Sequence, residues 1–259
     1  MAIHILWINP ISEVAAFNRP IAEFVNSAKR ADTQVDVISL KRGPMHLEYH
    51  YYEALILGDT LNQVKRAEKE GYDAAIIGCF YDPGLREARE ITDRIVVAAP
   101  AEASMLIAAG LGHRFSIIVG RDKWIPKMYE NVVKYGLISR LASFESVGLG
   151  VYDFQKDKTK TMRRIHKAAE RAVHEKLAEV IILGCTMEFG FYKELQEELK
   201  IPVIDAILAP LKYAEFMVEL RKNFGWGHSK ICDYKSPPIS EIKEWKLSTQ
   251  YPGMKGLWF

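Results

Sequence analysis

Two of the three cysteines stand in the same local sequence. Cys79 follows Ile76-Ile77-Gly78, and Cys185 follows Ile182-Leu183-Gly184. A thiol just past a buried strand, near the start of a helix, faces unpaired backbone N–H groups and the positive end of the helix dipole, and both favour the thiolate. Two such thiols could remove a proton from one face of a flat substrate and return one to the other face.

The chemistry that such a pair supports is proton transfer at a carbon beside a carbonyl group. Removal of the proton leaves an enolate, whose oxygen the N–H groups of the turns after the cysteines could stabilise. Gly78 and Gly184 would let a ligand lie against the main chain, because glycine has no side chain. A lone cysteine at a strand end is more often a small buried residue, but the repeated placement favours catalysis. Cys232 lacks this context and is interpreted as structural.

The order of elements that would position the two thiols is repeated along the chain. Apolar runs and turn residues predict strands at 3–8, 34–40, 73–78, 95–98, 115–119, 144–149, 179–184 and 202–205. Helices are expected at 20–30, 53–69, 82–89, 101–109, 124–135, 161–176, 192–199 and 208–220. Pro20 is placed in the first turn of its helix, and Asp82 is placed as an N-cap. The repeat predicts a duplicated unit.

Strands that alternate with helices form parallel sheets covered on both faces. We therefore predict an α/β fold of two pseudosymmetric halves, residues 1–98 and 99–207, each with a four-stranded parallel sheet. Ligands of such sheets bind beyond the carboxyl ends of the strands, so the active site is expected in the cleft between the halves. Residues 226–259 are predicted as an extended C-terminal arm, whose aromatic residues would pack on the protein itself or on a neighbouring subunit.

The composition is that of an ordinary globular protein. Hydrophobic residues make up 49% of the chain, and 35 basic residues stand against 33 acidic ones without basic runs, which argues against nucleic acid as a partner. No stretch is long and apolar enough for a signal or a membrane span, so we expect a cytoplasmic protein that binds no membrane. Three widely spaced cysteines match neither a disulfide framework nor a zinc pattern.

Three stretches of sequence resemble the aspartate/glutamate racemase superfamily, and specifically its hydantoin/allantoin racemase branch. They are residues 78–85, which read Gly-Cys-Phe-Tyr-Asp-Pro-Gly-Leu, residues 183–186, Leu-Gly-Cys-Thr, and residues 201–205, Ile-Pro-Val-Ile-Asp. The resemblance spans about residues 3–224, and the first motif is the more specific one. It implies flavodoxin-like halves, a helix at 208–225 that completes the first half, and a two-base mechanism through Cys79 and Cys185 without a cofactor or metal.

The residues expected to bind substrate lie at the ends of the predicted strands. They are Asn9, Pro10, Gly78, Phe80, Gly120, Arg121, Gly184 and Thr186. The chain departs from the branch in three of these loops: Ile11 and Ser12 follow Asn9-Pro10, Arg121 and Asp122 stand where threonines are usual, and Met187-Glu188 replaces a small residue and Gly-Met. These departures concern the identity of the substrate more than the chemistry.

The predicted function is racemisation of a small cyclic amide, such as a 5-substituted hydantoin or allantoin, by a homo-oligomeric, cofactor-independent isomerase. One alternative is cis–trans isomerisation of an unsaturated diacid, as in maleate isomerases, which also use two thiols. Another is a small-molecule binding protein in which the cysteines are incidental. A decarboxylase is a weaker alternative, because it would keep only one thiol.

His46 and His50 have the spacing of metal ligands if they lie on a helix, but we favour a polar loop over the cleft for this stretch.

Overall fold

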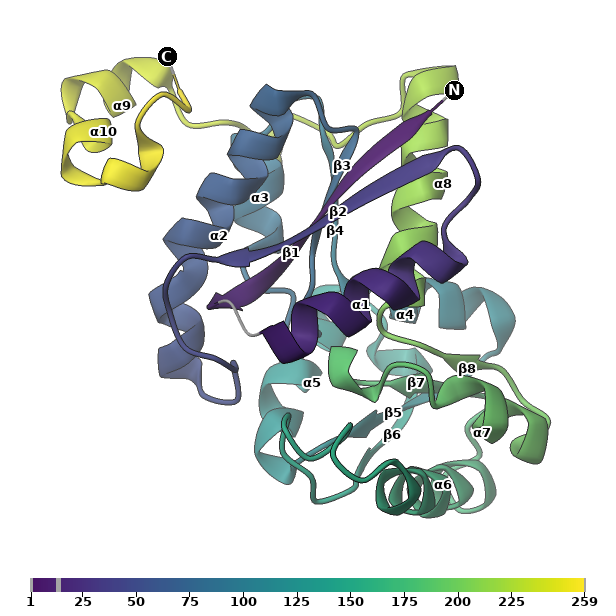
Figure 1. The fold of residues 1–259 in the computed structure, drawn as a ribbon. Coiled ribbons are helices and arrows are strands. Elements are labelled where there is room, and N and C mark those ends of the chain that lie inside the picture. Colours follow the sequence, from purple (N-terminus) through teal and green to yellow (C-terminus); the bar gives the residue numbers. More distant parts are fainter. Residues whose placement is uncertain (1, 13–14, 259) are drawn as a thin grey trace. The chain divides into compact units, whose positions relative to one another are not determined.

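The computed structural model describes residues 2–12 and 15–258, which form two four-stranded parallel sheets (Figure 1). The first sheet has the order β2-β1-β3-β4, with β1 (Ile3–Ser12), β2 (Thr33–Leu40), β3 (Ala74–Ile77) and β4 (Val96–Ala98). The second has the order β6-β5-β7-β8, with β5 (Phe115–Val119), β6 (Leu141–Ser146), β7 (Val180–Leu183) and β8 (Val203–Ile204). The two orders correspond strand by strand, so the predicted fold class is confirmed.

The chain divides into two compact units by its contacts. Unit 1 comprises Met1–Ile77, Pro83–Ala98 and Leu211–Phe259, and unit 2 comprises Gly78–Asp82 and Ala99–Pro210. The helices along the chain are α1 (Ala15–Ala28), α2 (His50–Glu70), α3 (Leu85–Ile91), α4 (Pro100–Leu111), α5 (Ile125–Lys134), α6 (Lys158–His174), α7 (Tyr192–Leu199), α8 (Leu208–Phe224), α9 (Ile239–Glu244) and α10 (Leu247–Gln250). The short piece Gly78–Asp82 follows β3 of unit 1 but belongs to unit 2 by its contacts.

The central strands β3 and β7 are apolar and buried along their whole length. Helix α2 packs on β1 and β3, and α4 packs on β5 and β7. Each large aliphatic side chain that is fully buried in this way contributes about 1.5–3 kcal/mol to stability. The helix before β3, predicted at 53–69, ends at the C-cap Gly71, whose φ of 87° is readily adopted by glycine. The residues directly after β3 and β7 are therefore held by rigid elements.

Strand β1 is longer than predicted. The predicted strand covers residues 3–8 and stops before Asn9-Pro10, but β1 continues to Ser12, and its pairing with β2 is irregular between Asn9 and Ser12. Pro10 has no N–H and cannot donate a hydrogen bond to a neighbouring strand. It is tolerated here because the pairing of β1 with β2 is irregular at this position. The N–H of Ser12 donates instead to the carbonyl of Pro44 over 3.0 Å.

Pro20 lies inside α1 and not in its first turn, so that prediction is wrong. The helix is already formed at Ala15, five residues earlier than the predicted start. A proline at this position cannot donate the usual hydrogen bond to the carbonyl four residues before it. The apolar periodicity that packs α1 on β2 outweighs this local cost.

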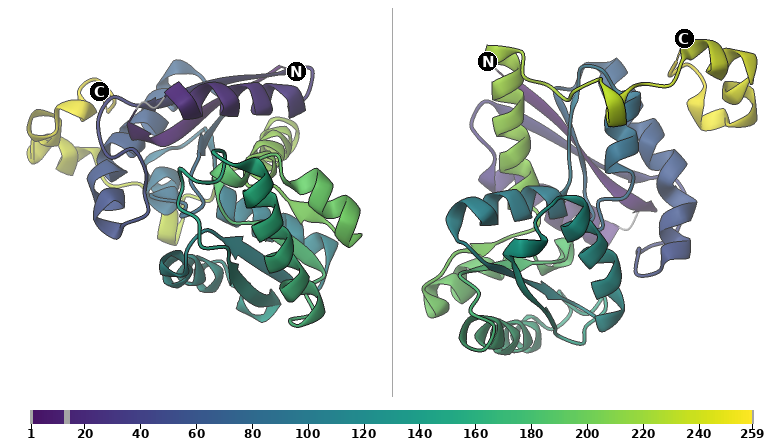
Figure 2. Two further views of the ribbon diagram at one scale, coloured as in Figure 1. Left: turned by 60° about the horizontal axis from the view of Figure 1, so that its bottom comes forward. Right: turned by 180° about the vertical axis from the view of Figure 1, so that it is seen from behind.

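The segment 226–259, predicted as an extended arm, contains short helices. These are α9, α10 and the 3-10 helices Cys232–Tyr234 and Pro252–Met254. Figure 2 shows the segment leaving α8 and running past α3 toward α9 and α10. The segment belongs to unit 1 and contacts α2 of that unit: Lys69 donates to the carbonyl of Gly256, and the amine of Lys65 lies 5.1 Å from the ring centroid of Trp258.

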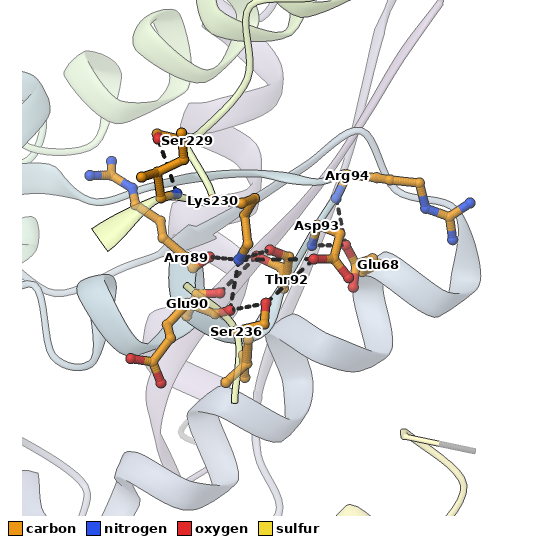
Figure 3. Close-up of polar contacts among 12 residues, drawn as sticks. Glu68, Arg89, Glu90, Thr92, Asp93, Arg94, Ser229, Lys230 and Ser236 are labelled. Atoms are coloured by element: carbon orange, nitrogen blue, oxygen red, sulfur yellow. Dashed lines mark hydrogen bonds and ion pairs between the residues drawn. The ribbon is translucent and has the colours of Figure 1, made fainter. Parts of the chain in front are cut away.

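The side chain of Lys230 fastens this segment to the end of α3 (Figure 3). Its amine donates to the carbonyl oxygens of Arg89, Glu90 and Thr92 over 2.9, 2.7 and 2.8 Å. The last carbonyls of a helix have no partner within the helix and carry partial negative charge, so a cation there is favourable. Ser236 adds a bond of 2.7 Å to the carbonyl of Glu90. The segment therefore caps α3 from outside the helix.

Within the described residues, the helices are too short or too polar to cross a membrane.

Candidate active site

Cys79 begins a tight turn directly after β3. The N–H of Asp82 donates to the carbonyl of Cys79 over 2.9 Å, which closes the turn. Phe80 and Tyr81 are buried at 3% and 8% exposure, whereas Cys79 is only half-buried. The side chain of Asn131 in α5 donates to the carbonyl of Tyr81 over 2.9 Å. The turn is anchored on both sides of the thiol, and the thiol itself remains accessible.

Asp82 fixes this turn to the start of α4. Its two carboxyl oxygens accept the N–H groups of Ala101 and Glu102 over 2.8 Å each, and the hydroxyl of Tyr135 donates to it over 2.7 Å. Burial raises the pKa of Asp82 to about 7, although these three donors oppose the shift. We predicted Asp82 as the N-cap of helix 82–89, and this is wrong: the N-cap of α3 is Gly84, and Asp82 instead accepts N–H groups from the first turn of α4.

Cys185 begins the corresponding turn after β7, which continues as the 3-10 helix Thr186–Glu188. The N–H of Met187 points to the sulfur of Cys185 over 3.5 Å, and the N–H of Glu188 donates to the carbonyl of Cys185 over 2.9 Å. A backbone N–H aimed at sulfur favours the thiolate. Cys185 and Thr186 are half-buried. The predicted placement of a thiol at an N-terminal turn is thus present at Cys185, although its helix is a single 3-10 turn.

Two of the glycines predicted to contact substrate are required by packing. A Cβ on Gly184 would lie 2.6 Å from the carbonyl oxygen of Ile118, which accepts the N–H of Gly184 over 2.7 Å. A Cβ on Gly120 would lie 2.4 Å from both the carbonyl of Leu149 and the ring of Trp124. Neither position has room for a side chain, so the structure explains both glycines without a ligand. Gly78 is buried between β3 and Cys79.

Asn9 and Pro10 are buried near the end of β1 in unit 1. The amide of Asn9 accepts the indole N–H of Trp7 over 2.7 Å and donates to Asn18 over 2.7 Å. The hydroxyl of Ser39 donates to the same oxygen of Asn18 over 2.7 Å. These bonds fix the Asn9 side chain among residues of its own unit.

The remaining polar candidates have simpler surroundings. Arg121 is exposed and precedes the 3-10 helix Asp122–Trp124, whose Trp124 N–H donates to the carbonyl of Arg121 over 3.0 Å. His46 lies in the loop before α2, whereas His50 is the first residue of that helix, so the two do not share a helical face. Within residues 2–12 and 15–258, no cluster of three or more His, Cys, Asp or Glu side chains could hold a metal ion.

Sequence reasoning missed a second buried carboxyl, Asp205, which follows β8. Its oxygens accept the N–H groups of Gly190 and Ile207 over 2.9 and 2.8 Å, so it ties the loop after Cys185 to the start of α8. Burial raises the pKa of Asp205 to about 6. The signal available in the sequence was its position, directly after a strand and three residues before an apolar helix, where an acid commonly caps.

Unit 2 thus contains most of the predicted site residues. By its contacts it includes both thiols, Cys79 and Cys185, together with Phe80, Gly78, Gly120, Arg121, Gly184 and Thr186. Asn9 and Pro10 belong to unit 1. These features define a class: an α/β protein with two matching parallel sheets, in which a glycine and a half-buried cysteine follow the corresponding strand of each sheet.

Comparison with known proteins identifies the family within that class. The family model described as Asp/Glu/Hydantoin racemase matches residues 5–214. The chain belongs to this family, so the predicted family is confirmed, and so is the predicted class of enzyme, an isomerase.

Individual relatives cover nearly the whole chain. A hydantoin racemase of Pseudomonas sp. (strain NS671) is 38% identical over 235 residues, which are 90% of this chain and 92% of that protein. A hydantoin racemase of Paenarthrobacter aurescens is 36% identical over 90% of this chain and 97% of its own. The solved structure of an allantoin racemase from Klebsiella pneumoniae superposes with a TM-score of 0.84 at 27% identity, covering 92% of this chain and 94% of its own.

Proposed function

We propose that this protein racemises a small cyclic amide with an acidic carbon, of the 5-substituted hydantoin or allantoin type. The observation that carries the proposal is the 38% identity to a hydantoin racemase over 90% of the chain. The superposition with an allantoin racemase supports the same kind of substrate. Both relatives are named for five-membered cyclic amides whose stereogenic carbon lies beside a carbonyl group.

The proposed mechanism uses Cys79 and Cys185 as two bases. The thiolate of one cysteine takes the proton from the stereogenic carbon and becomes a thiol, and the electron pair of the C–H bond moves into the enolate. The thiol of the other cysteine then gives its proton to the opposite face of that carbon and becomes a thiolate. The mechanism requires both sulfur atoms to reach the same carbon, and a proton must move between the cysteines or through solvent before the next turnover in the same direction.

Two features of the described residues support these roles. Both thiols are half-buried, so a ligand can reach them, and each follows the equivalent strand of its sheet. The N–H of Met187 directed at the Cys185 sulfur favours the charged form that a base needs. Backbone N–H groups of the same turns would also stabilise the enolate oxygen.

The test measures deuterium uptake by the substrate and its optical rotation in the same samples. Single enantiomers of a 5-substituted hydantoin and of allantoin are incubated with the protein in deuterated water, and the rate without protein is subtracted. We expect loss of optical rotation with uptake of one deuterium at the stereogenic carbon. Cys79→Ser and Cys185→Ser should each lower kcat/KM for racemisation by at least about 10²-fold. Cys232→Ser, an exposed cysteine in the C-terminal segment, is the matched control and should keep full activity.

Other outcomes separate the alternatives. A change in the absorbance of maleate without racemisation of either cyclic amide would favour the diacid isomerase. Normal ligand binding by both serine variants, with no deuterium uptake from any candidate, would favour a binding protein. We also propose a cytoplasmic homo-oligomer, which light scattering on the purified protein would test for its subunit number.

A further inference from the structure

Glu188 lies three residues after Cys185, and its side chain is completely buried. Its exposure is 0%, and neither carboxyl oxygen has a hydrogen-bond partner among the described residues. Glu188 is the last residue of the 3-10 helix that Cys185 caps, and its own N–H donates to the Cys185 carbonyl over 2.9 Å. The acid therefore shares one short turn with the thiol.

The turn is clamped on both sides, which keeps Glu188 buried. The side-chain amide of Gln155 donates to the carbonyls of Met187 and Phe189 over 2.9 and 3.3 Å. On the far side, the carboxyl of Asp205 accepts the N–H of Gly190 over 2.9 Å. Exposure of the Glu188 carboxyl to water would require this turn to leave its bonds with two other parts of unit 2.

The surroundings of Glu188 favour its neutral form. Burial raises the pKa of Glu188 well above its ordinary value, and the nearby buried carboxyl of Asp205 raises it further. The nearby backbone N–H groups of Cys185 and Gly184 act in the opposite direction, but neither makes a hydrogen bond of good geometry to the carboxyl. A buried carboxylate without a hydrogen-bond partner is energetically unfavourable. Glu188 is therefore expected to keep its proton at pH values where exposed glutamates are ionised.

Building on the proposed function, we propose that Glu188 is a positioning residue that titrates with Cys185 as one coupled pair, and that this pair carries at most one negative charge in the active enzyme. The thiolate of Cys185 and the carboxylate of Glu188, three residues apart in one turn, would repel each other, so ionisation of either group opposes ionisation of the other. A second charge would also repel the enolate formed beside the thiol. In the active form Cys185 is a thiolate and Glu188 is neutral. This form is lost at high pH, when Glu188 gives up its proton.

Two titrations on the full-length protein test the coupling without any substrate. The first measures the rate of Cys185 alkylation by iodoacetamide against pH, followed peptide by peptide with mass spectrometry, in the wild type and in Glu188→Gln. The second measures the carbonyl stretch of protonated Glu188 against pH by infrared difference spectroscopy, as wild type minus Glu188→Gln. The same difference spectrum is then recorded in the Cys185→Ser background. Gln has the shape of the neutral acid, so the buried turn should be retained.

We expect the Glu188 carbonyl band to be present at pH 7. Whichever of Cys185 and Glu188 ionises second in the wild type should titrate at lower pH in the variant that lacks the other group, Glu188→Gln or Cys185→Ser. Glu197→Gln, which removes an exposed carboxylate of α7, is the matched control and should move neither midpoint. Absence of the band at pH 7, or two midpoints that stay unchanged, would overturn the coupling. Because no substrate is used, a failure here leaves the racemase proposal intact, and a failure to racemise leaves the coupling measurable.

Discussion

The hydroxyl group of Tyr135 donates a hydrogen bond of 2.7 Å to the carboxyl of Asp82, the residue that closes the turn begun by Cys79. The same carboxyl accepts two N–H groups at the start of α4. One buried acid therefore ties together a thiol-bearing turn, the N-terminus of α4 and the residue that follows α5. The position of Cys79 depends on these bonds as well as on the strand before it.

Replacing Tyr135 with Phe should destabilise the protein more at pH 8 than at pH 5. Burial raises the pKa of Asp82 to about 7, so the carboxyl is mainly ionised at pH 8 and mainly neutral at pH 5. A hydroxyl bonded to a carboxylate contributes more than one bonded to a neutral acid, about 1.5–3 against about 0.5–1.5 kcal/mol. Urea unfolding at the two pH values measures the difference. Tyr129→Phe, at an exposed tyrosine of α5, is the control, and an equal loss at both pH values would contradict the prediction.

Asp82→Asn should show the opposite trend, with the larger loss of stability at pH 5. The folded protein holds a proton on Asp82 up to about pH 7, whereas the unfolded chain releases it near 3.8. The folded state therefore binds more protons between these values, and the contribution of Asp82 to the free energy of unfolding falls as pH rises from about 4 to about 7. The variant lacks this contribution. Unfolding free energies of both proteins at pH 5 and pH 8 measure it, and a loss that grows with pH would count against the raised pKa.

The order of strands and helices was predictable because it follows from local patterns of apolar, polar and turn residues. The buried strands β3 and β7 are continuous apolar runs followed by Gly-Cys, and both could be recognised along with the helices around them. The predicted correspondence of the two halves agrees with the matching strand orders. The amphipathic stretch 53–69 likewise predicted the helix α2, with its end one residue short.

The bonds that hold the site were not predictable, because their partners are far apart in sequence. Asp82 followed by Pro-Gly has the local pattern of an N-cap, but its partners are Ala101, Glu102 and Tyr135, which are 19 to 53 residues away. The C-terminal segment has no periodicity of its own, and its order comes from bonds such as that between His228 and Val97, 131 residues apart. Hydrogen bonds between residues so far apart in the chain cannot be predicted from local sequence.

His228 should make the protein less stable as the pH falls. Its ring nitrogen accepts the N–H of Val97 in the edge strand β4 over 2.9 Å, and burial, with the charges of Arg89 and Lys230, lowers the pKa of His228 to about 3. The unfolded chain takes up this proton near 6.5, so stability is lost as pH falls from about 6.5 toward about 3.

The measurement compares the wild type with His228→Gln, which keeps a hydrogen-bond acceptor but cannot be protonated. Between pH 7 and pH 5 the wild type should lose up to about 1–2 kcal/mol more unfolding free energy than the variant. His174→Gln, at an exposed histidine of α6, should leave the slope unchanged. Parallel curves for the wild type and His228→Gln would show that this imidazole takes up its proton as readily in the folded protein as in the unfolded chain.

Lys230→Met should loosen the C-terminal segment from α3. The amine of Lys230 is bonded to three carbonyl oxygens at the end of that helix, and methionine keeps the apolar stem but offers no donor. Because the lysine is partly exposed, the expected cost is about 1–3 kcal/mol for the three bonds together. Limited proteolysis should then cut the segment 226–259 faster than in the wild type, and thermal unfolding should begin at a lower temperature. Lys235→Met, at an exposed lysine five residues later, is the matched control. Equal cleavage rates in the two variants would mean that the aromatic contacts of the segment, and not the Lys230 amine, hold it in place.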